Sequence, residues 1–376
     1  MIDFIYLAGG FIISILLAVM IIPNILFVSH KRRLFDMPDS RKVHQRPVSR
    51  LGGVSFFPAI SVSFCLIIGT QLALSYYADT SMPHSIPYSF IFLGAGCMML
   101  YLIGIMDDIV GVGYRYKFIV QFIAAAILAF SGSWINTLGG LFGIWSIPAW
   151  IGIPFTIFVI IYITNAINLI DGIDGLASGL SIIAMIVFSL TFIFQHEYIY
   201  ALLAFATLGV LLPFWFYNVF GYTRHHHKLF MGDTGSLTLG YILSFIVIKF
   251  CTVSSATTEH DNFGVIIAIS ALFIPLLDVV RVVINRIARG KSPFLPDRSH
   301  IHHKLLDTGM RPRLTMLTIL GMSVLFIILN VLLSKHINIT ILLILDVVLW
   351  LIFIFTIDHF IQRHKKESVQ TEKSTS

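Results

Sequence analysis

Residues 165–175 read NAINLIDGIDG and place two carboxylates and two amides in a stretch whose neighbours are almost entirely apolar. A charged side chain near a bilayer centre costs at least ~2.5–3.5 kcal/mol, so acids retained in apolar surroundings usually serve a function. Four more polar islands stand out, namely GIMDDIVGVGYRYKFIVQ (104–121), KLFMGDTGS (228–236), PDRSHIHHKL (296–305) and RKVHQRPVSRLGG (41–53). Oxygen ligands beside glycine turns suit Mg²⁺, and a glycine-rich helix start suits phosphate.

The chain around these islands has the composition of a membrane protein. Of its 376 residues, 57% are hydrophobic and 12% are charged, whereas soluble proteins carry about 25% charged residues. Its apolar runs are about 20 residues long, which is the length an α-helix needs to cross ~30 Å of hydrocarbon. We therefore expect an all-α integral membrane protein with about eleven transmembrane helices, at roughly 4–29, 51–76, 88–106, 118–135, 148–167, 176–194, 198–217, 233–252, 263–285, 314–334 and 339–360.

Basic residues set the expected orientation. Of the 25 Lys and Arg residues, 23 lie in segments on one side of an eleven-span topology, and only Lys249 and Lys335 lie elsewhere. Because cytoplasmic loops carry the excess of Lys and Arg, we predict an external N-terminus and a cytoplasmic C-terminus. The net charge of +6 is thus explained by topology and does not indicate nucleic-acid binding. One membrane domain is expected over 1–360, with a disordered cytoplasmic tail over 361–376.

In this topology all five islands face the cytoplasm. Their aspartates would together cost ~12–17 kcal/mol at the bilayer centre, which exceeds a typical net stability of ~5–15 kcal/mol. They must therefore lie at the membrane edge or in a wet cleft. Because like charges repel, some must be protonated or share a cation such as Mg²⁺. The residues concerned are Asp107, Asp108, Asp171, Asp174 and Asp233.

Each island alone also has a purely structural explanation. MGDTGS could simply cap the helix that begins there, and Asp107 with Asp108 could be solvated residues at a helix end. The histidines at 300, 302 and 303 could form a surface cluster. Asp278 and Arg281 are expected to form an i,i+3 pair. Asp346 could relay protons, although we favour a structural hydrogen bond within the bundle. It is the common location of the islands that favours an active site.

The five ordered motifs, over about residues 40–330, resemble the polyprenyl-phosphate N-acetylhexosamine-1-phosphate transferase superfamily. Within it, RPVSRLGG and PDRSHIHHKL are similar to the bacterial undecaprenyl-phosphate GlcNAc-1-phosphate branch. The resemblance implies catalysis and lipid-phosphate contact by Asp107 and Asp108. It also implies Mg²⁺ coordination by Asp233, with Asn168 near the metal. The remaining implied contacts are with the donor: a basic residue at Lys117, a uridine pocket of Asp171, Asp174 and Phe230, and a loop for the diphosphate and sugar formed by Arg298, His300, His302 and His303. Arg115 is an alternative to Lys117.

The resemblance implies a reaction in which HexNAc-1-phosphate passes from a UDP-sugar to undecaprenyl phosphate and UMP is released. The implied cofactor is Mg²⁺, with Mn²⁺ as an alternative, and the implied location is the bacterial inner membrane with the active site on its cytoplasmic face. A homodimer remains open. The second candidate is phospho-MurNAc-pentapeptide transfer in peptidoglycan synthesis. A proton- or cation-coupled transporter is the alternative from another class, and it would distribute its acids through the depth of the bilayer.

Overall fold

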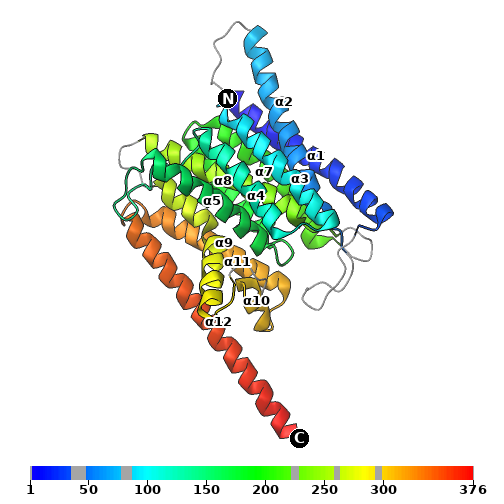
Figure 1. Cartoon of the computed structure of the whole chain (residues 1–376), viewed down its shortest axis with the longest axis vertical. Helices are drawn as coiled ribbons and strands as arrows, with labels where there is room; N and C mark the ends of the chain where they lie inside the picture. The colour runs from blue at the N-terminus through cyan, green and yellow to red at the C-terminus, as the bar shows by residue number, and fades with distance from the viewer. Residues whose placement is uncertain are drawn as a thin grey trace.

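The structure is a computed structural model that describes residues 2–34, 48–77, 87–221, 228–257, 263–292 and 299–375 (Figure 1). Helices dominate the described residues. The β-structure among these residues is limited to two isolated β-bridges. The elements are α1 (Ile2–Arg32), the short 3-10 helix η1 (Leu51–Ser55), α2 (Phe56–Tyr77), α3 (Ser89–Val110), α4 (Tyr114–Phe130), α5 (Ala149–Ile170), α6 (Leu176–Phe194), α7 (Tyr198–Phe220), α8 (Gly232–Thr257), α9 (Phe263–Ala288), α10 (Ile301–Asp307), α11 (Pro312–Leu333) and α12 (Ile339–Thr375).

The all-α membrane architecture predicted from the sequence is confirmed. Among the described residues, ten helices are long and apolar enough to cross a membrane. The eleventh expected span, over 118–135, corresponds to α4, which has 17 residues. That length is at the lower limit for crossing the hydrocarbon layer. The helix also starts at Tyr114, four residues before the expected span. Its first turn contains Arg115 and Lys117, which are too polar to be counted in an apolar run. The external position of the N-terminus stays a prediction.

The segment expected to be a disordered tail is helical in the structure, since α12 continues to Thr375. Figure 1 shows α12 leaving the bundle and ending far from the N-terminus. The residues after 360 include Gln, Arg, Lys and Glu, which are good helix formers despite their polarity. The expectation of disorder rested on polarity alone and did not weigh this propensity.

Helix α8 is the centre of the bundle, because 83% of its membrane-spanning window is buried. It packs against α3, α5 and α9. Tyr241 on α8 is fully buried and lies over Gly96 of α3. Its hydroxyl donates a 2.8 Å hydrogen bond to the carbonyl of Ala124 in α4. A buried phenol needs such a partner, so this contact fixes α3, α4 and α8 relative to one another.

Two loops join beside the start of α8. The amides of Gly52 and Gly53 donate to the carbonyls of Phe230 and Met231 at 3.0 and 2.9 Å, and the Phe230 amide donates to the Ser49 carbonyl at 2.8 Å. The Ser49 hydroxyl is also 2.8 Å from that of Ser29 on α1. The end of the first basic loop is thereby fixed against the MGDTGS motif.

The last helix holds the short helix α10. The Lys304 ammonium on α10 lies 2.6 and 2.8 Å from the two carboxylate oxygens of Asp358 on α12. Deeper in the bundle, Asn330 of α11 donates to Asp346 of α12 at 2.6 Å. Both of these residues are fully buried, so the predicted structural hydrogen bond at Asp346 is present.

Close approach of α3 and α8 depends on Gly104. A Cβ atom at this position would overlap the backbone of Thr234, with the Thr234 nitrogen only 2.7 Å away. Backbone atoms cannot rotate aside, so the two helices would have to separate. A Cβ atom at Gly94, also on α3, would meet nothing within 4 Å.

We predict that Gly104→Ala destabilises the detergent-solubilised protein by ~1–3 kcal/mol, the usual cost of overpacking. The matched variant Gly94→Ala should leave the thermal unfolding midpoint unchanged or raise it, because Ala favours helix over Gly. Thermal unfolding of the two purified variants measures the difference. Equal midpoints would contradict the assigned contact between α3 and α8.

Candidate active site

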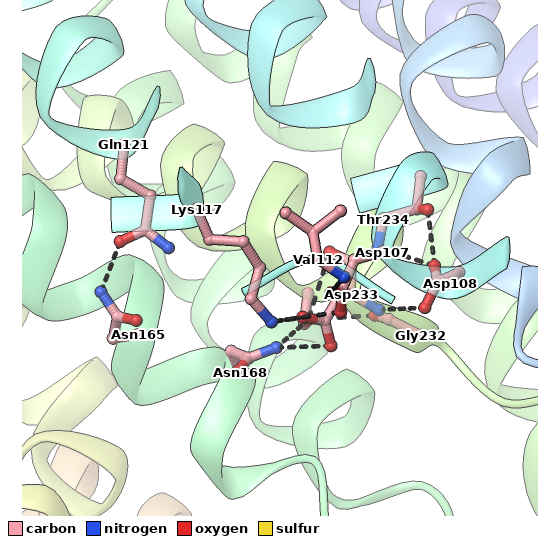
Figure 2. A network of polar contacts seen from close by, with 11 residues as sticks. Asp107, Asp108, Val112, Lys117, Gln121, Asn165, Asn168, Gly232, Asp233 and Thr234 are labelled. Carbon is pink, nitrogen blue, oxygen red and sulfur yellow. Dashed lines mark hydrogen bonds and ion pairs between the residues drawn. The ribbon is translucent and has the colours of Figure 1, made fainter. Parts of the chain in front are cut away.

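The centre of the site is an ammonium group between two carboxylates. Nζ of Lys117, from the first turn of α4, lies 3.1 Å from Oδ2 of Asp107 and 2.5 Å from Oδ2 of Asp233. Asp107 comes from the end of α3 and Asp233 from the start of α8, and Figure 2 shows the lysine reaching between them. The other Asp107 oxygen accepts a 2.6 Å hydrogen bond from the Val112 amide. The lysine thus neutralises two acids that would otherwise repel each other.

Asp108 binds the beginning of α8 instead of pointing toward Lys117. Its oxygens accept hydrogen bonds from the amides of Asp233 and Thr234 at 2.8 and 2.9 Å and from the Thr234 hydroxyl at 2.6 Å (Figure 2). The amides at a helix start lack partners within the helix, and here a neighbouring helix supplies the acceptor. The sequence indicated phosphate or a local cap at MGDTGS, whereas two of its amides bind Asp108.

The backbone turn at Gly232 makes this arrangement possible. Its φ is +68°, which disfavours other residues. A Cβ atom would also lie 2.6 and 2.7 Å from the two Asp108 oxygens. Any larger residue would therefore displace Asp108 from the start of α8.

Amides from α5 complete this side of the site. Asn168 donates to Oδ1 of Asp233 at 3.2 Å and to the Ser236 hydroxyl at 2.8 Å. One turn earlier, Asn165 donates to Gln121 of α4 at 2.6 Å (Figure 2). Asn168 therefore contacts the predicted metal ligand directly, while Asn165 holds α5 against α4.

The two acids after α5 occupy different environments. The sequence placed Asp171 and Asp174 on one helix face if a helix began there, but they lie in the turn between α5 and α6. Asp174 pairs with Lys228 at 2.5 Å, and the Lys228 ammonium lies 5.8 Å from the centre of the Phe230 ring. Burial, with smaller contributions from the charges of Asp174, Asp233 and Asp108, raises the pKa of Asp171 to about 7.

Sequence reasoning missed the residue that holds this turn. Asn218, near the end of α7, accepts a 2.5 Å hydrogen bond from the Gly175 amide and donates at 2.7 Å to the Leu229 carbonyl. It thereby joins the turn DGID (171–174) to the segment that carries Lys228 and Phe230. The available signal was a single amide at the end of the apolar run PFWFYN.

The histidine motif lies against the same turn. A Cβ atom at Gly172 would overlap the His302 ring, which is 1% exposed. The rings of His300 and His302 are stacked with centroids 5.8 Å apart, and His303 lies 4.3 Å from His302. His300 and His302 are buried, so the surface-cluster alternative is wrong for them.

The described residues therefore bring most of the predicted site together from five separated segments. Arg298, residues 41–47 and the RHHH sequence at 224–227 lie outside the described residues. Arg115 is exposed, and its Nε contacts the Tyr114 hydroxyl at 3.4 Å, so Lys117 is the basic residue that reaches the acids. The i,i+3 pair of Asp278 and Arg281 is present at 2.6 Å.

Comparison with known proteins agrees with this geometry. The sequence profile of glycosyl transferase family 4 matches residues 90–251. Over 318 residues, the chain is 30% identical to a Bacillus subtilis (strain 168) protein named "Probable undecaprenyl-phosphate N-acetylglucosaminyl 1-phosphate transferase", covering 82% of this chain and 80% of that relative. The chain belongs to the polyprenyl-phosphate N-acetylhexosamine-1-phosphate transferase superfamily.

Two further relatives carry the name undecaprenyl-phosphate alpha-N-acetylglucosaminyl 1-phosphate transferase. The Salmonella typhi protein is 31% identical and the Escherichia coli (strain K12) protein 29% identical, each over 290 residues that cover 76% of this chain and 72% of the relative. Membership in this superfamily makes the chain a membrane-embedded transferase and hence an enzyme. The predicted resemblance to the bacterial GlcNAc-1-phosphate branch is thereby confirmed.

The residues around Lys117 fit the magnesium ion that this transferase superfamily implies. The oxygens of Asp107 and Asp233 are carboxylate donors of the kind that Mg²⁺ prefers, whereas Asn168 presents its amide nitrogen to Asp233. Among the described residues there is no group of three or more His, Cys, Asp or Glu side chains that could hold a metal ion. Mg²⁺ needs only one or two ligands from the protein, because it keeps several waters and is also bound by substrate phosphates.

The raised pKa of Asp171 predicts a pH dependence of stability. An unfolded aspartate titrates near pH ~3.9, so between about pH 4 and 7 the folded transferase keeps a proton that the unfolded chain has lost. Stability from this group therefore falls as the pH rises through that range. Asp171→Asn should unfold at a higher temperature than wild type at pH 8, and the difference should shrink toward pH 4.

Thermal unfolding in detergent and EDTA at several pH values measures this effect. Asp174→Asn is the comparison variant, because it removes the ion pair with Lys228 together with one of the charges that raise the pKa of Asp171, so its gain at pH 8 should be smaller than that of Asp171→Asn. Equal midpoints for wild type and Asp171→Asn at pH 8 would contradict the assigned burial of this carboxyl group.

Proposed function

We propose that the chain transfers HexNAc-1-phosphate, with GlcNAc-1-phosphate as the first candidate, from a UDP-sugar to undecaprenyl phosphate. The products are undecaprenyl-diphosphate-HexNAc, which initiates a cell-surface glycan, and UMP. The observation that carries the proposal is the Asp107–Lys117–Asp233 network at one end of a membrane bundle, in a chain whose relatives are named for this transfer. The proposed location is the bacterial inner membrane, with this network on the cytoplasmic side.

In the proposed reaction, an oxygen of the lipid phosphate attacks the β-phosphorus that carries the sugar. A bond forms between that oxygen and the phosphorus, and the bond from the phosphorus to the UMP oxygen breaks. Such a transfer needs alignment and charge neutralisation more than covalent help. Asp107 would accept a proton from the lipid phosphate or form a phospho-aspartyl intermediate, and Lys117 would contact the phosphate oxygens.

Mg²⁺, or Mn²⁺ as the alternative, would be held by Asp233 beside Asn168, whose amide nitrogen contacts this carboxylate in the structure, and it would neutralise charge on the diphosphate. Asp108 supports this arrangement indirectly, because its three hydrogen bonds fix the backbone that carries Asp233. Asp171, Asp174 and Phe230 would form the uridine side of the site. His300, His302 and His303, with Arg298, would contact the diphosphate and sugar.

The test is UMP release by the purified protein with undecaprenyl phosphate and Mg²⁺. The donor panel is UDP-GlcNAc, UDP-GalNAc and UDP-MurNAc-pentapeptide, with the lipid product identified by mass spectrometry. We expect turnover with UDP-GlcNAc. Turnover with the pentapeptide donor alone would move the chain to the peptidoglycan branch. No UMP from any donor would contradict the proposal.

A second prediction separates Lys117 from Arg115. Lys117→Gln leaves Asp107 and Asp233 facing each other without a cation and removes a phosphate contact. We expect it to lower UMP release about 100-fold, as removal of one charge-stabilising donor does elsewhere. Arg115→Gln should change the rate less than about 2-fold, because this side chain is exposed. The opposite ranking would return the catalytic cation to Arg115.

A further inference from the structure

The proposed function leaves one buried charge cluster unused, and it lies directly behind the histidine motif. Asp278 on α9 is completely buried. Its Oδ1 accepts from the Arg281 guanidinium at 2.6 Å and from the Ile301 amide at 3.0 Å. Its Oδ2 lies 2.8 Å from Nδ1 of His300. A single carboxylate therefore contacts a side chain on its own helix and both a side chain and the backbone of the loop.

Arg281 makes a second connection to the loop. The nitrogen that binds Asp278 also donates at 2.6 Å to the carbonyl of Ser299. Residues 299, 300 and 301 are thus each bound to α9 through this pair of charged side chains. The Asp278–Arg281 pair therefore connects α9 to residues 299–301, in addition to forming an i,i+3 contact within α9.

The next residue along the chain is His302, and its position follows from this attachment. Its ring lies parallel to that of His300, with an interplanar angle of 8°, and against Gly172 of the DGID turn. Both ring nitrogens of His302 are buried and have no hydrogen-bond partner within the described residues. Buried polar groups are normally paired, so this imidazole is suited to bind a ligand that enters the site.

The charge state of His302 agrees with that reading. Burial, together with the neighbouring His303 and His300, lowers the pKa of His302 to about 3. The ring is therefore neutral at physiological pH and offers one donor and one acceptor. A neutral ring acts through directed hydrogen bonds, which depend strongly on its position.

A buried ion pair is weak evidence for stability, because desolvation of the charges offsets their attraction. The bonds of Asp278 and Arg281 to the loop give this pair a different use. We propose that Asp278 is a positioning residue that, with Arg281, fixes residues 299–301 on α9 so that His302 is presented to the sugar-diphosphate donor at the Asp171–Gly172 turn. This inference rests on the proposed function for the identity of the donor, and on geometry alone for the placement of His302.

The kinetic test compares Asp278→Ala with Asp346→Ala. Asp346 is a matched control, because it is also fully buried and bonded to one side chain, Asn330, but lies in α12. We expect Asp278→Ala to raise the KM for UDP-GlcNAc about 10-fold and to change the KM for undecaprenyl phosphate less than 2-fold. Asp278→Asn keeps an oxygen acceptor for the Ile301 amide and should give an intermediate KM. A general loss of stability would affect the KM for UDP-GlcNAc and the KM for undecaprenyl phosphate alike.

A second measurement needs no substrate. Diethyl pyrocarbonate modifies accessible neutral imidazoles, and peptide mass spectrometry reports the rate at His302. In wild type we expect slow modification, since the ring is 1% exposed. The rate should rise about 10-fold in Asp278→Ala and stay unchanged in Asp346→Ala. Arg281→Gln, which loses the bond to Ser299, should raise the rate by a smaller factor and serves if Asp278→Ala does not fold.

The two measurements separate the two proposals. If wild type releases no UMP from any donor, the proposed function fails, while His302 reactivity still tests the placement. If wild type is active and both folded variants, Asp278→Asn and Arg281→Gln, keep the wild-type donor KM and His302 reactivity, the positioning role is overturned. Equal increases in donor and acceptor KM would also overturn it.

Discussion

The structure depends on neutralising several acids that lie at the edge of an apolar bundle. Asp107, Asp108, Asp171, Asp174 and Asp233 come from three places in the sequence, and their mutual repulsion would separate the helices that carry them. The acids are neutralised in four different ways. Lys117 lies between two of them, the amides of α8 bind Asp108, Lys228 pairs with Asp174 and burial favours the protonated form of Asp171. The same contacts that relieve the repulsion also fix the ends of α3, α4, α5 and α8.

This arrangement separates residues that the proposed function places at a substrate from residues that build the site. Asp107 and Asp108 are adjacent, yet only Asp107 shares Lys117 with Asp233, whereas Asp108 is fully engaged with the α8 backbone. Likewise, Asp278 on α9 contacts His300 of the histidine loop, and Asn218 on α7 accepts a hydrogen bond from the Gly175 amide, directly after the DGID turn. The carboxylates and amides in and around the motifs thus divide into two groups, and sequence spacing alone does not separate them.

The sequence predicted the features that arise from local composition. Apolar runs located the helices, and the glycine and acid content of MGDTGS located the beginning of α8 at Gly232. The convergence of the islands was predictable because the expected topology placed them on one side. What could not be predicted were pairings between segments distant in sequence, such as Asp108 with Thr234 or Asp278 with Ile301. The exact ends of two helices were also missed. The polar end of α12 has a high helix propensity and the first turn of α4 is aromatic and basic, and a hydropathy pattern detects neither feature.

The ion pair between Lys304 and Asp358 connects the last helix to the segment that carries the histidine motif. Asp358 lies on α12, and its partner Lys304 lies two residues after His302 on α10. The last helix therefore contacts α10, the short helix that carries His302 and His303, as well as α11 of the bundle. Shortening α12 before Asp358 would remove this contact, whereas shortening it after Gln362 would leave both partners in place.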